Sequence, residues 1–466
     1  MENLQNWINN AVGSINDVVW GLPTVFLLCG TGIILTILLK GIQFRGFFHA
    51  IQVIRGKFDH KDDPGEVNHF QALCTALSAT VGLGNIAGVA IAIGIGGPGA
   101  VFWMILVGLL GMCTKYSECT LGLMYRRVDK EGVVHGGPMY YIEAAFGGGS
   151  LGKKVAAFFA LACIFASFGA ANMFQTNQAA SVAEATMGIN KHVTGIVLAV
   201  MTAVVIVGGI KRIGKVASYI VPFMGGIYVI GALIIIIANF AQLPAIFSMI
   251  MSAAFAGSAA VGGFAGATFK AVMLQGVKRA CFSNEAGIGS SPFAHSAAAT
   301  REPVREGSVA ILEPFVDTVI ICTMTALVIL ITGEWENGKP GDWVQGALIT
   351  AKAFNYTIPH FGNYFIPIAV FFFAYSTLIS WSYYGERSID YLFKGKGLLT
   401  YKLVFCAVAY FGAIWNAQGV NNFSEMMMGI MIFPNLIAVI LLMPTLSRAT
   451  TEYFGKLKRG EFEQKD

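Results

Sequence analysis

The segment Ser78–Gly88, SATVGLGNIAG, constrains the fold of this chain more than any other. It lies inside a run of 48 residues, Val67–Thr114, that contains no Asp, Glu, Lys or Arg. A run this long and apolar is typical of a membrane span, which needs about 20 residues. Yet Gly82, Gly84 and Gly88 interrupt it, and each glycine weakens a helix by about 1 kcal/mol relative to alanine.

A helix that breaks inside a bilayer must satisfy the backbone groups that the break frees. In hydrocarbon, an N–H or C=O group without a partner costs several kcal/mol. Two interpretations of this segment stay open. Either the small residues let a neighbouring helix pack closely, or the break forms a polar site of the kind that transporters place near the midplane of the membrane.

The composition also indicates a membrane protein. Of 466 residues, 55% are hydrophobic and 12% are charged, whereas soluble domains are about 25% charged. The sequence lacks the alternating segments of about ten residues that β-barrels use, so we predict an all-α polytopic membrane protein. The eight cysteines show no CxxC spacing and are predicted to be buried thiols. The net charge of +5 is small and lies in loops, which argues against nucleic-acid binding.

The apolar runs predict eleven spans. The uncharged run Val216–Phe269 is long enough for the sixth span, an outer connection containing Pro244 and the start of the seventh span. Lys and Arg are concentrated in every second loop, which places the N-terminus outside and the C-terminus in the cytoplasm. The better delimited spans are approximately 20–39, 155–183, 193–210, 361–385, 403–416 and 426–447.

Two similar tetrapeptides indicate an internal repeat. Asn85–Gly88 reads NIAG and Asn284–Gly287 reads NEAG, at an offset of 199 residues. The same offset aligns the third to sixth spans with the eighth to eleventh. Each copy has five spans, an odd number, so the second copy starts from the opposite face. We therefore predict four units: an extra helix and loop (1–66), two inverted repeats (67–260 and 261–447) and a cytoplasmic tail (448–466).

Five motifs together resemble the alanine or glycine:cation symporter family: SATVGLGNIAGVA, HGGPMYYIE, FQTNQ, GVKRACFSNEAGIGSSP and STLISWSYYGER. The VGLGN segment in the first broken helix is similar to the LeuT-type transporter fold. This resemblance implies a five-plus-five inverted repeat and sodium-coupled symport of alanine, glycine or both into the cell, with sodium as the coupling ion. Composition and spacing alone reach only a cell-membrane transporter with a polar midplane site.

The resemblance implies a substrate site for an amino-acid zwitterion. Freed backbone N–H groups and the Asn85 amide would bind the carboxylate, and Gln175 would bind the amine. The alternatives are that Asn85 caps the break and that Gln175 bonds a neighbouring helix. Phe282 and Trp381 would wall the pocket and limit the substrate side chain to about a methyl group. The full predicted set is Thr80, Gly82, Gly84, Asn85, Gln175, Phe282, Thr377 and Trp381.

The resemblance also implies a sodium site, because hard cations prefer oxygen ligands. Its predicted ligands are the carbonyl groups of Ser78, Val81 and Phe373 and the hydroxyl groups of Ser376 and Thr377. Thr377 is thus a candidate for contact with either the substrate or the sodium ion. The alternative is that these hydroxyl groups bond back to their own helix.

Charged residues inside the predicted spans leave open how these charges pair and which ion drives transport. Lys278 and Arg279 lie just before the second break, with Glu118, Glu285, Glu313 and Asp317 as candidate partners. Proton coupling through Glu118 or Glu285 is an alternative to sodium coupling, and a channel is a second alternative. The chain contains no P-loop or HExxH motif, so we do not expect an enzyme.

The alternation of basic loops predicts which positions face outward. In a background without reactive cysteines, a cysteine at Asn337 should react from outside with an impermeant maleimide, and one at Asp390 should not. The opposite labelling pattern would contradict both the orientation and the inverted repeat.

Overall fold

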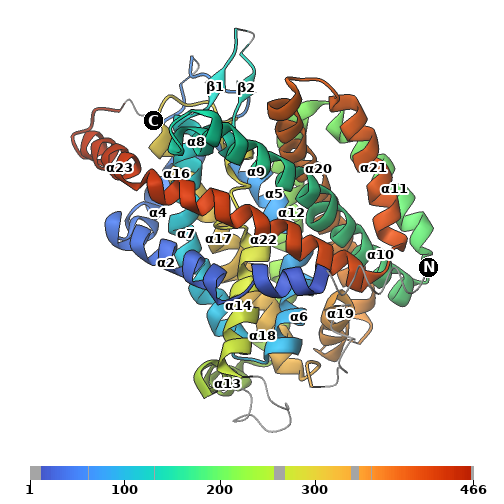
Figure 1. Cartoon of the computed structure of the whole chain (residues 1–466). Coiled ribbons are helices and arrows are strands. Elements are labelled where there is room, and N and C mark those ends of the chain that lie inside the picture. Colours follow the sequence, from blue (N-terminus) through green and yellow to red (C-terminus); the bar gives the residue numbers. More distant parts are fainter. Residues whose placement is uncertain are drawn as a thin grey trace.

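The computed structural model describes residues 12–60, 62–130, 132–256, 268–336, 346–357 and 359–462, and nearly all of them are helical. The predicted boundary between the repeats, at 260 and 261, and Asn337 lie outside these ranges. The described part contains one two-stranded antiparallel sheet, formed by β1 Arg127–Val128 and β2 Val134–His135 at the top of Figure 1.

The helices before residue 257 include two π-helical segments, η1 and η2, and one 3-10 turn, η3. In chain order they are α2 Leu22–Leu38, α3 Ile42–Arg45, α4 Phe47–Ile54, α5 His69–Thr80, η1 Gly84–Gly88, α6 Val89–Gly96, α7 Ala100–Met124, α8 Pro138–Ala145, α9 Ser150–Phe168, η2 Gly169–Met173, α10 Phe174–Met187, α11 Lys191–Ile206, α12 Gly209–Ala238, η3 Phe240–Gln242 and α13 Leu243–Ala256.

The helices after residue 267 include the π-helical segment η5 and the longest helix described, α20. In chain order they are α14 Phe269–Asn284, α15 Pro292–His295, α16 Pro303–Ala310, α17 Leu312–Pro314, η5 Phe315–Cys322, α18 Thr323–Thr332, α19 Gly346–Thr357, α20 Phe361–Phe393, α21 Leu398–Ile414, α22 Ala417–Leu441 and α23 Met443–Lys458.

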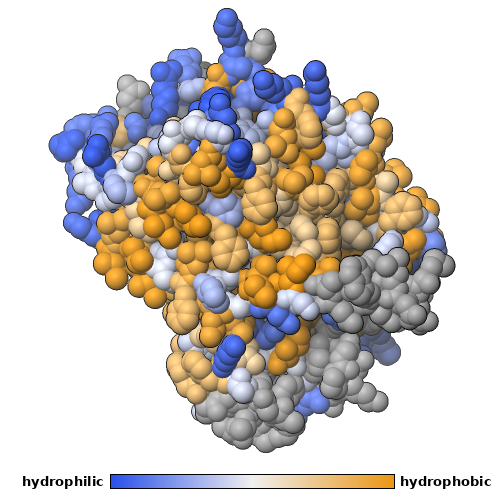
Figure 2. All heavy atoms as spheres, viewed as in Figure 1, coloured by the Kyte–Doolittle hydropathy of each residue, from blue (hydrophilic) through white to orange (hydrophobic). Residues whose placement is uncertain are grey.

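Seven described helices are long and apolar enough to cross a membrane, and the bent pair α5–α6 makes eight. The predicted eleven spans add α11, α14 and α21, which have 16, 16 and 17 residues. The exact count therefore stays a prediction. Figure 2 shows an apolar belt across the molecule, with hydrophilic residues gathered at the end that carries β1, β2 and α23.

Two connections are more regular than a simple loop. The predicted outer connection containing Pro244 forms a helix, α13, because proline fits the first turn of a helix, where its missing N–H is not needed. The HGGPMYYIE motif starts in β2 and continues into a short helix, α8.

The first broken span starts with a strong cap and stops at its glycines. The Asn68 side chain accepts from the Gln71 N–H at 2.8 Å, and the Gln71 side chain accepts from the Asn68 N–H at 3.2 Å. This reciprocal pair satisfies donors that a helix start leaves free. After Thr80 the chain bends by 49° and resumes as η1 and α6.

The second break lies directly against the first. Glu285, Gly287 and Gly289 have φ angles of 59°, 89° and 85°, a left-handed conformation that glycine adopts without cost. A Cβ atom added to Gly84 would lie 3.1 Å from the Ser283 Cα atom. Glycine at position 84 therefore lets the two breaks approach each other.

A buried ion cluster joins α14 to α22, and it corrects one prediction. Lys278 Nζ lies 2.5 Å from Glu425 Oε2, and Arg279 pairs with the other oxygen of the same carboxylate. The partner is thus none of the four predicted acids. The Trp20 indole donates to the Glu425 carbonyl at 2.9 Å, and Asn16 donates to its carboxylate at 3.0 Å, so residues that precede α2 join the cluster as well.

Removing Glu425 should destabilise the fold. In Glu425→Ala, the buried Arg279 loses its counter-charge, and breaking a buried pair in this way costs about 3–5 kcal/mol. We expect a clear fall in the thermal unfolding midpoint of the purified protein. Glu452→Ala is the matched control, because Glu452 forms an exposed pair with Lys456 and exposed pairs contribute little. Equal midpoints for the two variants would contradict a structural role for the cluster.

Candidate functional site

A small cavity lies where the two breaks meet α10, α20 and α22. Its volume is about 10 Å³, which is room for about one water molecule. Six of the eight predicted substrate residues line it, and Gly82 and Asn85 do not. The lining residues are Ala79, Thr80, Gly84, Ala170, Ala171, Gln175, Phe282, Glu285, Thr377, Trp381 and Met428.

Side chains satisfy the backbone N–H groups at the first break. The Gly82 N–H donates to Asn85 Oδ1 at 2.8 Å, and the Leu83 N–H donates to Gln175 Oε1 at 2.9 Å. The Gln175 amide in turn donates to the Ala170 carbonyl at 3.0 Å. Both side chains thus make the contacts that the structural alternatives described, and substrate contact by either one stays a prediction.

Asp317 connects the two breaks, and sequence reasoning missed this role. The Asn85 amide donates to Asp317 Oδ1 at 2.6 Å, and the Ser283 hydroxyl donates to Asp317 Oδ2 at 2.9 Å. The sequence named Asp317 only as a candidate partner for Lys278 and Arg279. Its position in an apolar run was the available signal, since an acid inside a span requires a polar partner.

The cavity has a carboxylate in its wall, which the predicted substrate set also omitted. Glu285 Oε1 accepts from the Trp381 indole at 2.8 Å, and Glu285 Oε2 accepts from the Ser290 hydroxyl. Thr377 lies four residues before Trp381 on α20, and both line the cavity, because residues at this spacing share one face of a helix. The Thr80 hydroxyl donates to the Ala76 carbonyl at 3.2 Å.

The predicted sodium ligands lie together between α5 and α20. The Ser78 hydroxyl donates to the Ser376 carbonyl at 2.7 Å, which ties the two helices. The Ser376 hydroxyl bonds back to the Phe373 carbonyl at 2.9 Å, as the alternative described. Val81 has left helical geometry, with a ψ angle of 85°. The Thr377 hydroxyl is buried and has no hydrogen-bond partner among the described residues, and a sodium ion held by this group of oxygens stays a prediction.

Comparison with known proteins decides the family. The family model described as the sodium:alanine symporter family matches residues 5–466. The chain belongs to the sodium:alanine symporter family. The sodium/alanine symporter AgcS of Methanococcus maripaludis is 42% identical to it over 451 residues, which cover 97% of this chain and 98% of that protein. The probable sodium/glutamine symporter GlnT of Bacillus subtilis is 34% identical over 460 residues, which cover 98% of this chain and 93% of GlnT.

Solved structures show the fold of this symporter. The structure of MhsT in complex with L-phenylalanine matches with a TM-score of 0.55 at 13% identity, over 84% of this chain and 98% of MhsT. The manganese transporter of Eremococcus coleocola, in complex with an aromatic bis-isothiourea compound, matches with a TM-score of 0.54 at 12% identity, over 82% of this chain and 81% of that one. The symporter is therefore a multi-pass membrane transporter of LeuT-type fold, and not an enzyme.

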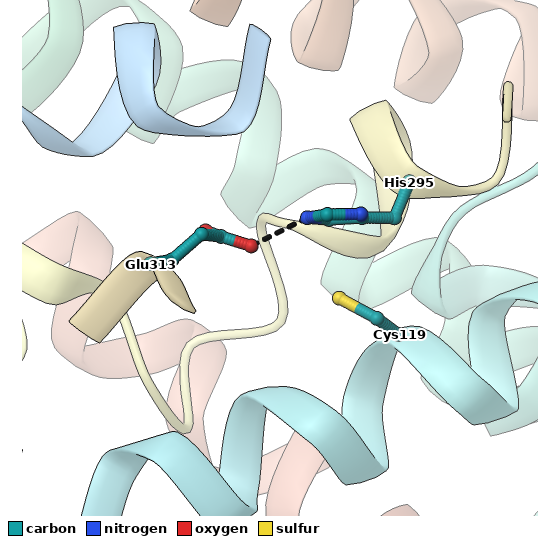
Figure 3. Close-up of side chains that lie close together, drawn as sticks. All are labelled: Cys119, His295 and Glu313. Carbon is teal, nitrogen blue, oxygen red and sulfur yellow. Dashed lines mark hydrogen bonds and ion pairs between the residues drawn. The ribbon is translucent and has the colours of Figure 1, made fainter. Parts of the chain in front are cut away.

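Beyond the second break, buried ionisable side chains from α7, α15, α16 and α17 form a connected cluster. Figure 3 shows three of its neighbours, Cys119, His295 and Glu313, with a link of 2.5 Å between His295 Nε2 and Glu313 Oε1. His295 Nδ1 contacts Glu306 at 2.6 Å, and Lys115 lies 3.2 Å from Glu313. Because both ring nitrogens face carboxylates, we interpret this group as an ion-pair network rather than a transition-metal site.

A methyl group at Gly82 should block the cavity. A Cβ atom there would lie 2.5 Å from Thr377 Oγ1 and 3.1 Å from Gln175 Oε1. The added methyl group would displace Thr377 and Gln175, which both line the cavity, so Gly82→Ala should weaken alanine binding measured by calorimetry. Gly88→Ala is the control, since its nearest neighbours would be 3.9 Å away. Normal affinity in Gly82→Ala would show that the substrate binds elsewhere.

Proposed function

We propose that this symporter couples sodium entry to the uptake of alanine or glycine by alternating access. One observation carries the proposal: the cavity between the two breaks shares Thr377 with the group of oxygens between α5 and α20. A substrate in the cavity and a cation beside Ser376 would therefore be neighbours. The relative named a sodium/alanine symporter, at 42% identity, supports the same pairing of ligands.

The cavity favours a small zwitterion. Phe282 and Trp381 occupy two of its walls, and the rest of its lining combines small residues with the polar residues Thr80, Gln175, Glu285 and Thr377. The carboxylate of Glu285 would attract an ammonium group, and backbone N–H groups at the first break would serve a carboxylate. Since the cavity has room for about one water molecule, alanine binding requires these walls to move apart.

Sodium would act by holding α5 against α20. The Ser78–Ser376 hydrogen bond already places the two helices in contact, and an ion shared by oxygens of both would strengthen that contact. The ordered α5 would then present the first break to the substrate. Linkage requires sodium and alanine to tighten each other's binding by the same factor. We propose an orientation with the N-terminus outside and the C-terminus in the cytoplasm.

Proton coupling is a second candidate, and one observation favours it. Glu285 is a buried carboxylate in the wall of the cavity, so it is placed to exchange a proton when the cavity opens. A pH gradient that drives alanine uptake without sodium would support this candidate.

Uptake by reconstituted protein tests the proposal. Proteoliposomes should accumulate radiolabelled alanine when an inward sodium gradient is imposed, and accumulation should stop when potassium replaces sodium. Uptake that continues without sodium at zero pH gradient would contradict coupled transport and favour a channel.

Shortening a wall should widen specificity. Phe282 packs against Phe174, with ring centroids 5.2 Å apart, so Phe282→Ala removes one side of the cavity. We expect larger amino acids to inhibit alanine uptake about tenfold more strongly than in the unmodified protein. The equivalent change at Phe371, which lines a different pocket between α20, α10 and α11, should leave the inhibitor profile unchanged. If Phe282→Ala has no effect on that profile, the boundary of the pocket lies elsewhere.

Two hydroxyl variants should separate the sodium and substrate sites. Ser376→Ala should raise the sodium concentration for half-maximal uptake several-fold, while alanine affinity at saturating sodium stays nearly normal. Thr377→Ala should impair both, because Thr377 lines the cavity and adjoins Ser376. The sodium dependence of uptake gives the sodium concentration for half-maximal uptake, and calorimetry gives the alanine affinity at saturating sodium. An unchanged sodium dependence in Ser376→Ala would exclude a sodium site at this position.

A further inference from the structure

A second and larger pocket lies far from the substrate cavity, between the end of α2 and the C-terminal helix α23 (Figure 1). Its volume is about 650 Å³, within the range of small-molecule sites. Three cations line it, Lys40, Arg45 and Lys458, and none of its ten lining residues is acidic. None of the three cations forms an ion pair with any residue that the structure describes.

Hydrogen bonds between α23 and two neighbouring helices fix the walls of this pocket. The Tyr453 hydroxyl lies 2.8 Å from His49 Nε2, and the Thr450 hydroxyl lies 2.7 Å from the Tyr116 hydroxyl. These two contacts hold α23 against α4 and α7. The Arg45 guanidinium lies 5.3 Å from the centre of the Phe454 ring, so a basic group and an aromatic wall are paired inside the pocket.

An exposed apolar stripe leads from the membrane to this pocket. Phe26, Ile33, Ile34 and Ile37 are exposed on one face of α2 at helical spacing. The stripe ends at Leu38, which lines the pocket beside the buried Leu39 and Lys40. A ligand with an anionic head and hydrocarbon tails would therefore meet cations at its head and apolar side chains along its tails.

We propose that this pocket binds the head group of an anionic phospholipid from the leaflet on the side of the basic loops. The phosphate would lie among Lys40, Arg45 and Lys458, the Ser447 hydroxyl would donate to the head group, and the acyl chains would follow α2. Each basic group near an anionic membrane surface adds to the attraction for the head group. The pocket would thus keep a lipid on α23 irrespective of which solute the symporter carries.

Native mass spectrometry of the purified full-length protein tests this proposal. Delipidated protein is titrated with phosphatidylglycerol, or with phosphatidylcholine of the same acyl chains. Arg45→Gln/Lys458→Gln removes two of the pocket cations. Lys211→Gln/Lys215→Gln is the matched control, because it removes the same charge from exposed residues at the start of α12.

We expect one phosphatidylglycerol to bind tightly to the unmodified protein and the control. Binding to the pocket variant should fall roughly 30-fold, which corresponds to about 2 kcal/mol at 1.4 kcal/mol per factor of ten. Lys458→Gln alone should reduce it about fivefold, which gives a readout if the double variant does not fold. Equal retention by the pocket and control variants, or equal binding of phosphatidylcholine, would overturn the proposal. Displacement of the lipid by millimolar inorganic phosphate would show a soluble-anion site instead.

Discussion

The structure depends on how the first break satisfies its backbone inside the membrane. The glycines free the N–H groups of Gly82 and Leu83, which would each cost several kcal/mol if they were left unpaired in hydrocarbon. Asn85 and Gln175 accept from them at 2.8 and 2.9 Å. Because Gln175 belongs to α10, the break is tied to a neighbouring helix. A substrate carboxylate that takes over these donors would release that tie, so binding and helix movement share the same hydrogen bonds.

Asp317 extends this constraint to the second break. It accepts from Asn85 on one side and Ser283 on the other. Glu425 then holds Lys278 and Arg279, in the part of α14 that leads into the second break. The two broken helices are thus joined to each other through η5, and we expect them to move together with the eighth span. Glu285, at the start of the second break, lines the cavity and contacts Trp381 of α20, where the moving and stationary parts of the transporter would meet.

The features that could be predicted from the sequence are those that depend on a local pattern of residues. Glycine spacing located the first break, the repeated tetrapeptide located the second, and the motifs identified the family. The sequence did not predict which polar atoms meet across the chain. Glu425 lies 146 residues from Arg279, and nothing in either neighbourhood identifies the other. The roles of Asn85 and Gln175 also needed coordinates, since an amide can serve a substrate or a helix end equally well. Similarly, the uncharged run around Pro244 gave no sign that the connection is helical.

The central claim is that one ion and one substrate order the same pair of helices, with Thr377 between them. Calorimetric titration of alanine into the unmodified protein across a sodium series, and of sodium across an alanine series, tests this most directly. We predict that saturating sodium strengthens alanine binding and that saturating alanine strengthens sodium binding by the same factor, of about 5–150-fold. Alanine affinity that does not change with sodium would contradict the account.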